Sequence, residues 1–255
     1  MPERWLAPKN IPGDQATGAY VCNWMTTCVV IDLAKHIIAS NSADLIFNYD
    51  LARPVDQEIM TVYNIRCGSY NIVATVTSDP ATAHRWVCEI INLHRNHAYR
   101  QRCLLVGLGV QWVSRHAATL QLCVGSNCLI FQLHHADHCP NVLRSFLVDQ
   151  NVIRVALWDN AIGAMLWGSP HALWVGRVGD VRRAAYALMR CGRGATMGQL
   201  AQEILGIPGM QMDEAVACSD WEDQELTFQQ VEYACHAVAL PLLMALELRL
   251  WEYFL

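Results

Sequence analysis

The stretch LLVGLGVQW, from Leu104 to Trp112, has the apolar content of a buried β-strand, but two glycines, Gly107 and Gly109, interrupt it. Strand interiors normally exclude glycine, because it loses much backbone entropy on folding and has no side chain to pack. A glycine inside such a strand therefore indicates either a close approach of another part of the backbone or a position from which a side chain has been lost.

The sequence on both sides of this stretch alternates between strand-like and helix-like patterns. A Gly-Ser pair between two apolar runs predicts a hairpin, and Asp79 followed by Pro80 predicts the start of a helix. Thr227 and Gln230 have capping-box spacing at the start of the longest helix, which Pro241 should kink or break. The predicted strands cover residues 61–67, 70–78, 104–112, 119–125, 128–133, 151–158 and 173–180. The third to fifth of these form an antiparallel meander, and the whole pattern predicts an α/β sandwich with a mixed sheet.

Composition limits the classes of partner. Hydrophobic residues make up 53% of the 255 residues and charged residues only 16%, against about 25% charged residues in typical soluble proteins. So few charges suggest that some apolar surface meets a partner or another copy of the chain, although ordinary burial in a protein rich in small residues would explain them equally well. The net charge of −5 and the lack of a basic run give no reason to expect electrostatic capture of nucleic acid.

Cysteine usage and hydropathy indicate a reducing compartment. The chain has 11 cysteines without a CxxC pair, and no signal peptide precedes them. Reduced cysteines, mostly in the core, are therefore expected in a cytoplasmic or nuclear protein. The longest apolar runs, near residues 21–34 and 234–246, are broken by polar residues or proline, so no membrane span is predicted.

Several segments in consistent order resemble one known family. They are VTSDPATAHRWVCEI, LLVGLGVQW, LQLCVGSNCLIFQL, VIRVALWDN, LGIP and SDWEDQELTFQQVEYACHAVA. Together they are similar to the plant Werner-syndrome-type 3′–5′ exonucleases of the DnaQ-like, or DEDD, group. The resemblance implies an α/β ribonuclease H-like fold, with a mixed sheet of five to six strands flanked by helices. It also implies an exonuclease-like domain at residues 58–255, preceded by an extension at 1–57 that docks on the domain or contacts a partner.

In active members of the group, four carboxylates hold two Mg²⁺ or Mn²⁺ ions, and the resemblance implies where these acids would stand. The family motif GLDxEW aligns with residues 107–112, so Gly109 stands at the aspartate position and Gln111 at the glutamate position. The motif VGVxIxxD places Asn160 at the next aspartate position. The adjacent Asp159 could act as a rescue acid only after a one-residue slip, since neighbouring strand residues face opposite sides.

The third motif, helical YxxxD, keeps its tyrosine at Tyr233 but has Ala237 at the acid position. His236 is a poor substitute, because it lies about 100° further around the helix axis. All four acid positions are thus substituted under this alignment. We therefore expect no catalytic residue, no bound metal and no cofactor at Gly109, Gln111, Asn160, Tyr233 and Ala237, which would be vestiges of an active site.

Three functions are compatible with this interpretation. The first is a catalytically inactive exonuclease-like protein that acts by binding a protein partner, which could be an active relative or, by self-association into an oligomer, another copy of the chain. The second is nucleic-acid binding without cleavage, which would be weak. The third is a residual metal-dependent 3′–5′ exonuclease that uses Asp159 together with Glu222, Asp223 or Glu232.

Two other segments contain residue types that bind ligands. The first, HHADHC, has the residue types of a zinc site, although a solvated loop is the favoured interpretation; its candidate ligands are His134, His135, His138 and Cys139. The second, HRNHAYRQR at residues 94–102, mixes arginines with a tyrosine, as a phosphate-binding patch would. Cations that interact with the negative end of a helix dipole explain this second segment equally well.

Overall fold

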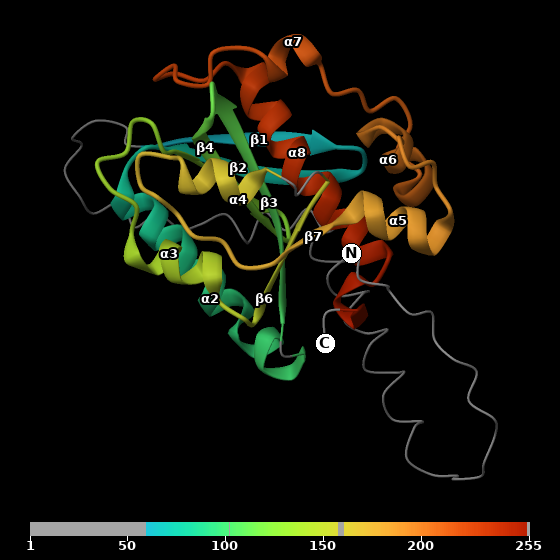
Figure 1. The fold of residues 1–255 in the computed structure, drawn as a ribbon. Coiled ribbons are helices and arrows are strands. Elements are labelled where there is room, and N and C mark those ends of the chain that lie inside the picture. The colour runs from blue at the N-terminus through green and yellow to red at the C-terminus, as the bar shows by residue number, and fades with distance from the viewer. Residues whose placement is uncertain (1–59, 102, 158–160, 254–255) are drawn as a thin grey trace, which may run out of the picture.

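The structure, a computed structural model, describes residues 60–101, 103–157 and 161–253 (Figure 1). Within these ranges, the side chains of residues 95–101 are not described. The extension expected at residues 1–57 lies outside the described residues, as do Asp159 and Asn160. No helix in the described part of the chain combines the length and the apolar character needed to cross a bilayer.

The fold is built on a seven-stranded mixed sheet with the order β1-β2-β5-β4-β3-β6-β7. As predicted, β3, β4 and β5 form an antiparallel meander. The hairpin of β1 and β2 joins β5 through a parallel pair, and β6 and β7 continue the sheet in parallel beyond β3. The strands are β1 (Met60–Cys67), β2 (Tyr70–Thr77), β3 (Leu104–Val113), β4 (His116–Val124), β5 (Asn127–Gln132), β6 (Val152–Ala156) and β7 (Val178–Asp180).

The sheet has the seven strands that the sequence pattern predicts, which is more than the five to six that the family resemblance implies, because the hairpin at one edge and β7 at the other both pair with it. β7 is only three residues long, against the predicted strand at 173–180. Its length is limited by Asp180, whose carboxylate accepts hydrogen bonds from the backbone N–H groups of Arg182 and Arg183 and so starts the next helix.

Helices cover both faces of the sheet. Figure 1 shows α2 and α3 next to each other, with α5, α6 and α8 grouped on the other side. The elements are α2 (Pro80–Gln101), α3 (Asn141–Val148), α4 (Ile162–Trp167), α5 (Val181–Met189), α6 (Met197–Leu205), α7 (Glu214–Ala217), α8 (Phe228–Glu247) and the 3₁₀-helix η2 (Leu250–Tyr253). Two buried apolar clusters result, one on each face of the sheet.

Local capping signals predicted several helix ends correctly. Asp79 accepts hydrogen bonds from the backbone N–H groups of Ala81 and Thr82 and so starts α2. Thr227 and Gln230 form the predicted capping box of α8. Each cap satisfies backbone donors that have no partner within the helix.

Pro241 was expected to kink or break the longest helix, and it does not break it, since α8 runs through Pro241 to Glu247. A proline inside a helix removes one backbone hydrogen bond and costs about 3 kcal/mol. Leu240, Leu242 and Leu243 around it are almost fully buried against the sheet. Their burial, at roughly 1.5–3 kcal/mol for each side chain, offsets that cost.

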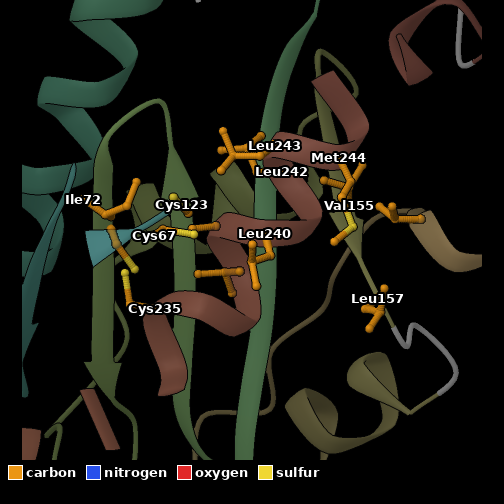
Figure 2. Close-up of a cluster of buried hydrophobic side chains, with 14 of the residues drawn as sticks. Cys67, Ile72, Cys123, Val155, Leu157, Cys235, Leu240, Leu242, Leu243 and Met244 are labelled. Carbon is orange, nitrogen blue, oxygen red and sulfur yellow. The ribbon is translucent and has the colours of Figure 1, made fainter. Parts of the chain in front are cut away.

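Cysteines lie mainly in the core, as predicted. Seven of the nine described cysteines are buried, while Cys218 is exposed. Figure 2 shows Cys67, Cys123 and Cys235 within the apolar cluster between the sheet and α8. Burial, and to a smaller extent the neighbouring Cys235 and Cys123, raise the pKa of the Cys67 thiol to about 12. A thiol with this pKa is almost entirely protonated at neutral pH and is therefore a poor nucleophile.

We expect this burial to separate the cysteines by reactivity. With iodoacetamide at neutral pH, Cys218 should be alkylated at least about 100-fold faster than Cys67 and Cys128, because the buried thiols react only after local opening. Peptide mass spectrometry over a time course measures each rate, and labelling in denaturant gives the unprotected reference. Labelling of Cys67 in the folded protein as fast as that of Cys218 would contradict this packing.

Candidate functional site

The two glycines of β3 lie where α8 crosses the sheet. A Cβ atom placed on Gly107 would be 2.1 Å from the backbone oxygen of Val238, and one on Gly109 would be 2.7 Å from Cγ1 of Val238. Real Cβ atoms do not approach other heavy atoms so closely. The close approach of the helix backbone therefore explains the glycine at position 107. At position 109 the helix is also close, but through the side chain of Val238.

Alternation along β3 and β4 defines the face that α8 covers. Val106, Leu108 and Val110 belong to the apolar cluster on the α2 side, so Gly107, Gly109 and Gln111 face α8. Gly109 pairs with Gln121 of β4, and Gln111 pairs with Thr119. The two acid positions of the first family motif, Gly109 and Gln111, thus share a face with two polar residues of the neighbouring strand.

Thr119 and Gln121 are fully buried polar residues that the sequence analysis missed. Nε2 of Gln121 donates a hydrogen bond to the Thr119 hydroxyl over 2.5 Å. Oε1 of Gln121 is buried without a hydrogen-bond partner among the described residues, and it would lie 3.1 Å from a Cβ atom on Gly109. The alternation in TLQLCVG could have placed both side chains on one face. The space beside Gly109 therefore holds the Val238 side chain and a neutral amide.

The positions of the third motif lie on α8, in the same interface. Tyr233 is half-buried, and its ring centroid is 6.1 Å from that of Trp221. Burial, with a smaller contribution from Cys218, raises the pKa of the Tyr233 hydroxyl. Ala237 directly precedes Val238, whereas His236 forms a hydrogen bond from Nε2 to the backbone oxygen of Arg66 on β1, 2.8 Å away. The His236 side chain is thus hydrogen-bonded to the backbone of β1.

These side chains do not fit a pair of divalent cations. Mg²⁺ and Mn²⁺ prefer anionic oxygen ligands, and Gly109, Gln111, Tyr233 and Ala237 supply no carboxylate. A longer side chain at position 109 would also meet Val238. The position of the second motif follows β6, which lies parallel beside β3, but Asn160 and the candidate rescue acid Asp159 are outside the described residues.

The residues of HHADHC do not converge on one point. His135 donates from Nε2 to the backbone oxygen of Glu222 over 2.7 Å, and the buried Cys139 thiol contacts the backbone oxygen of Pro140. His134 instead lies near His116 and Glu222. The second segment, at residues 94–102, continues α2 to Gln101, but the side chains of its arginines are not described.

Comparisons with known proteins agree on the fold. No protein-family model matches the sequence. The chain is 28% identical over 170 residues to exonuclease 3′-5′ domain-containing protein 2 of Drosophila melanogaster; the match covers 64% of this chain but only 27% of that relative.

Among solved structures, Brucella melitensis NrnC has a TM-score of 0.51 and 15% identity, with 59% of this chain and 74% of that chain covered. The chain has the ribonuclease H-like fold of the DnaQ-like 3′–5′ exonucleases. Escherichia coli RNase D, an exoribonuclease involved in structured RNA processing, has a TM-score of 0.50 and 16% identity over 60% of this chain and 40% of its own.

The contact of α8 with this exonuclease-like sheet predicts which glycines can be replaced. Gly109→Ala should lower the free energy of unfolding by about 1–3 kcal/mol, because the new methyl group must displace Val238 or the backbone. Gly192→Ala is the matched control, since a Cβ at that position meets nothing within 4 Å. Urea denaturation of both variants measures the difference.

A second substitution tests whether Val238 is the obstacle. In the double variant Gly109→Ala/Val238→Ala, the loss of stability should be smaller than the sum of the two single losses, by about 0.5–3 kcal/mol, because the smaller side chain leaves room for the new methyl group. A double variant whose losses simply add would show that residues 109 and 238 do not compete for the same space.

Proposed function

We propose that this chain is a catalytically inactive 3′–5′ exonuclease-like protein that acts by binding another protein. The observation that carries the proposal is the contact of Val238 and Gln121 with Gly109, in the place where the family resemblance puts the first metal-binding acid. The described motif positions supply no carboxylate to offset the mutual repulsion of two dications, and a two-metal mechanism needs both ions to stabilise the attacking and leaving oxygens.

An exposed pair of tryptophans supports a binding function. Trp167 at the end of α4 is 51% exposed, and Trp174 in the following loop is 68% exposed. Their ring centroids are 4.5 Å apart at an interplanar angle of 45°. Tryptophan is enriched among the residues that contribute most to protein–protein binding energy, because its large apolar surface leaves water when the partner docks.

The two alternatives are nucleic-acid binding without cleavage and a residual nuclease. Exposed aromatic rings can also stack on bases, but the net charge of −5 does not favour the approach of a polyanion. A residual nuclease would need Asp159 with recruited acids. Of those acids, Glu222 lies beside His116 at the start of β4, which is none of the positions where the family resemblance places an acid.

The first test measures catalysis. The full chain, incubated with end-labelled single-stranded RNA or DNA and Mn²⁺ or Mg²⁺, should show no shortening from the 3′ end, because the described motif positions have no metal ligands. Denaturing gels resolve single-nucleotide steps, and Asp159→Asn is the matched variant. Metal-dependent trimming that disappears in Asp159→Asn would establish the residual nuclease and refute the proposal.

The second test measures nucleic-acid binding. Fluorescence anisotropy of a labelled single-stranded RNA should show no saturable binding at micromolar protein, at either low or moderate salt. Saturable binding that weakens as salt increases, the signature of phosphate contacts, would favour the nucleic-acid alternative instead.

The third test asks whether a second copy is the partner. If the chain self-associates, sedimentation velocity should show a dissociation constant at least about tenfold higher for Trp167→Ala/Trp174→Ala, as expected when buried aromatic anchors are removed. Trp112→Ala is the matched control, because Trp112 is also exposed (49%) but lies on β3 outside the pair. A chain that stays monomeric at all concentrations excludes self-association and leaves a different protein as the partner.

A further inference from the structure

Three side chains from different parts of the chain converge at the end of the sheet where β4 begins. They are His116, the first residue of β4; His134, just after β5; and Glu222, between α7 and α8. None of them is at a position where the family resemblance places an acid. Because β4 and β5 are antiparallel, the start of one lies beside the end of the other, and the His134 N–H donates to the backbone oxygen of Ala118 over 3.0 Å.

The distances within this cluster are close to those of a metal site. Oε1 of Glu222 is 2.8 Å from Nε2 of His116 and 3.5 Å from Nδ1 of His134. One ligand atom from each residue lies within 4.8 Å of the other two. Around a tetrahedral Zn²⁺ with bonds of about 2.0–2.1 Å, neighbouring ligand atoms are roughly 3.3 Å apart. Small side-chain rotations would therefore bring all three atoms to bonding distance.

The segment that carries Glu222 is held in place by other residues. Nε2 of His135 donates to the backbone oxygen of Glu222 over 2.7 Å. Nε2 of Gln132 donates to the backbone oxygens of Asp223 and Gln224, at 3.1 and 3.0 Å. The neighbouring Trp221 is 1% exposed and packs in the core. A backbone fixed in this way loses little entropy when its side chain binds an ion.

We propose that His116, His134 and Glu222 bind one divalent transition-metal ion, with Zn²⁺ as the best match. Two imidazoles and one carboxylate are a ligand set that zinc accepts, while Mg²⁺ and Ca²⁺ prefer oxygen ligands alone. The three side chains are 33%, 39% and 28% exposed, so an ion can reach them from solvent. A fourth coordination position is open to water. Without metal, Glu222 instead accepts a hydrogen bond from His116.

Isothermal titration of the metal-free full chain with ZnCl₂ tests the proposal. We expect about one strongly bound Zn²⁺ per chain, and an affinity at least about tenfold weaker in each of His116→Ala, His134→Ala and Glu222→Gln. Glu222→Gln is the most conservative of these, because its amide oxygen can still accept the hydrogen bond from His116. His138→Ala and Cys218→Ser are matched controls: both residues are exposed and can bind metals, but they lie outside the cluster.

Two further measurements separate this site from binding at cysteines and from misfolding. Co²⁺ in place of Zn²⁺ should give visible absorption bands of a four-coordinate ion without thiolate charge-transfer bands, and His116→Ala should remove them. Zn²⁺ should also raise the melting temperature of the wild-type chain and not that of Glu222→Gln, since a ligand stabilises the state that binds it. Zn²⁺ affinity that is equal in the wild type and in His116→Ala/His134→Ala would overturn the proposal, as would a Co²⁺ spectrum dominated by thiolate bands.

Discussion

The direct packing of α8 on β3 is the constraint on which the rest of the structure depends. At Gly107 the helix backbone itself meets the strand, and at Gly109 the Val238 side chain does. Because β3 lies inside the sheet, between β4 and β6, its other face packs Val106, Leu108 and Val110 against the second cluster. A side chain at Gly107 would have to displace a helix that contacts strands across most of the sheet, and one at Gly109 would have to displace the Val238 side chain. The packing of α8 therefore explains why these two strand positions hold glycine, although glycine has a low strand propensity.

The same packing bears on chemistry. A carboxylate beside Gly109 would be placed against the apolar Val238 side chain and the Gln121 amide oxygen, which repels another acceptor. Taking a charge out of water costs several kcal/mol unless a metal or a cation compensates it. Neither Gln111 nor Ala237 helps to attract such a metal. In this chain the packing of α8 leaves the space beside Gly109 occupied by Val238 and Gln121, and our proposal of an inactive exonuclease-like protein rests on that packing.

Sequence reasoning was accurate where the deciding interactions are local. The hairpin turn, the cap at Asp79 and the capping box at Thr227 each involve residues within a few positions of one another, and all are present. It was inaccurate where tertiary contacts decide: the core burial of the leucines around Pro241 keeps α8 continuous, and β7 is shorter than the predicted strand at 173–180, with only Val178–Asp180 paired with β6. Alignment with the family motifs placed the candidate site on β3 and α8. It did not find the buried pair Thr119 and Gln121, because their positions opposite Gln111 and Gly109 depend on the register between β3 and β4. His116 and Glu222 are 106 residues apart, so no local pattern could join them.

The proposed zinc site also connects to the packing of α8. Glu222 precedes Thr227, the N-cap of α8, by five residues, and the buried Trp221 beside it contacts Tyr233 one and a half turns into the helix. The glycine contacts fix the middle of α8, whereas the segment before it is held by side-chain hydrogen bonds from Gln132 and His135. An ion bound by Glu222, His116 and His134 would restrain that segment further. Metal binding and helix packing would then stabilise one another, because each holds α8 in the position that the other requires.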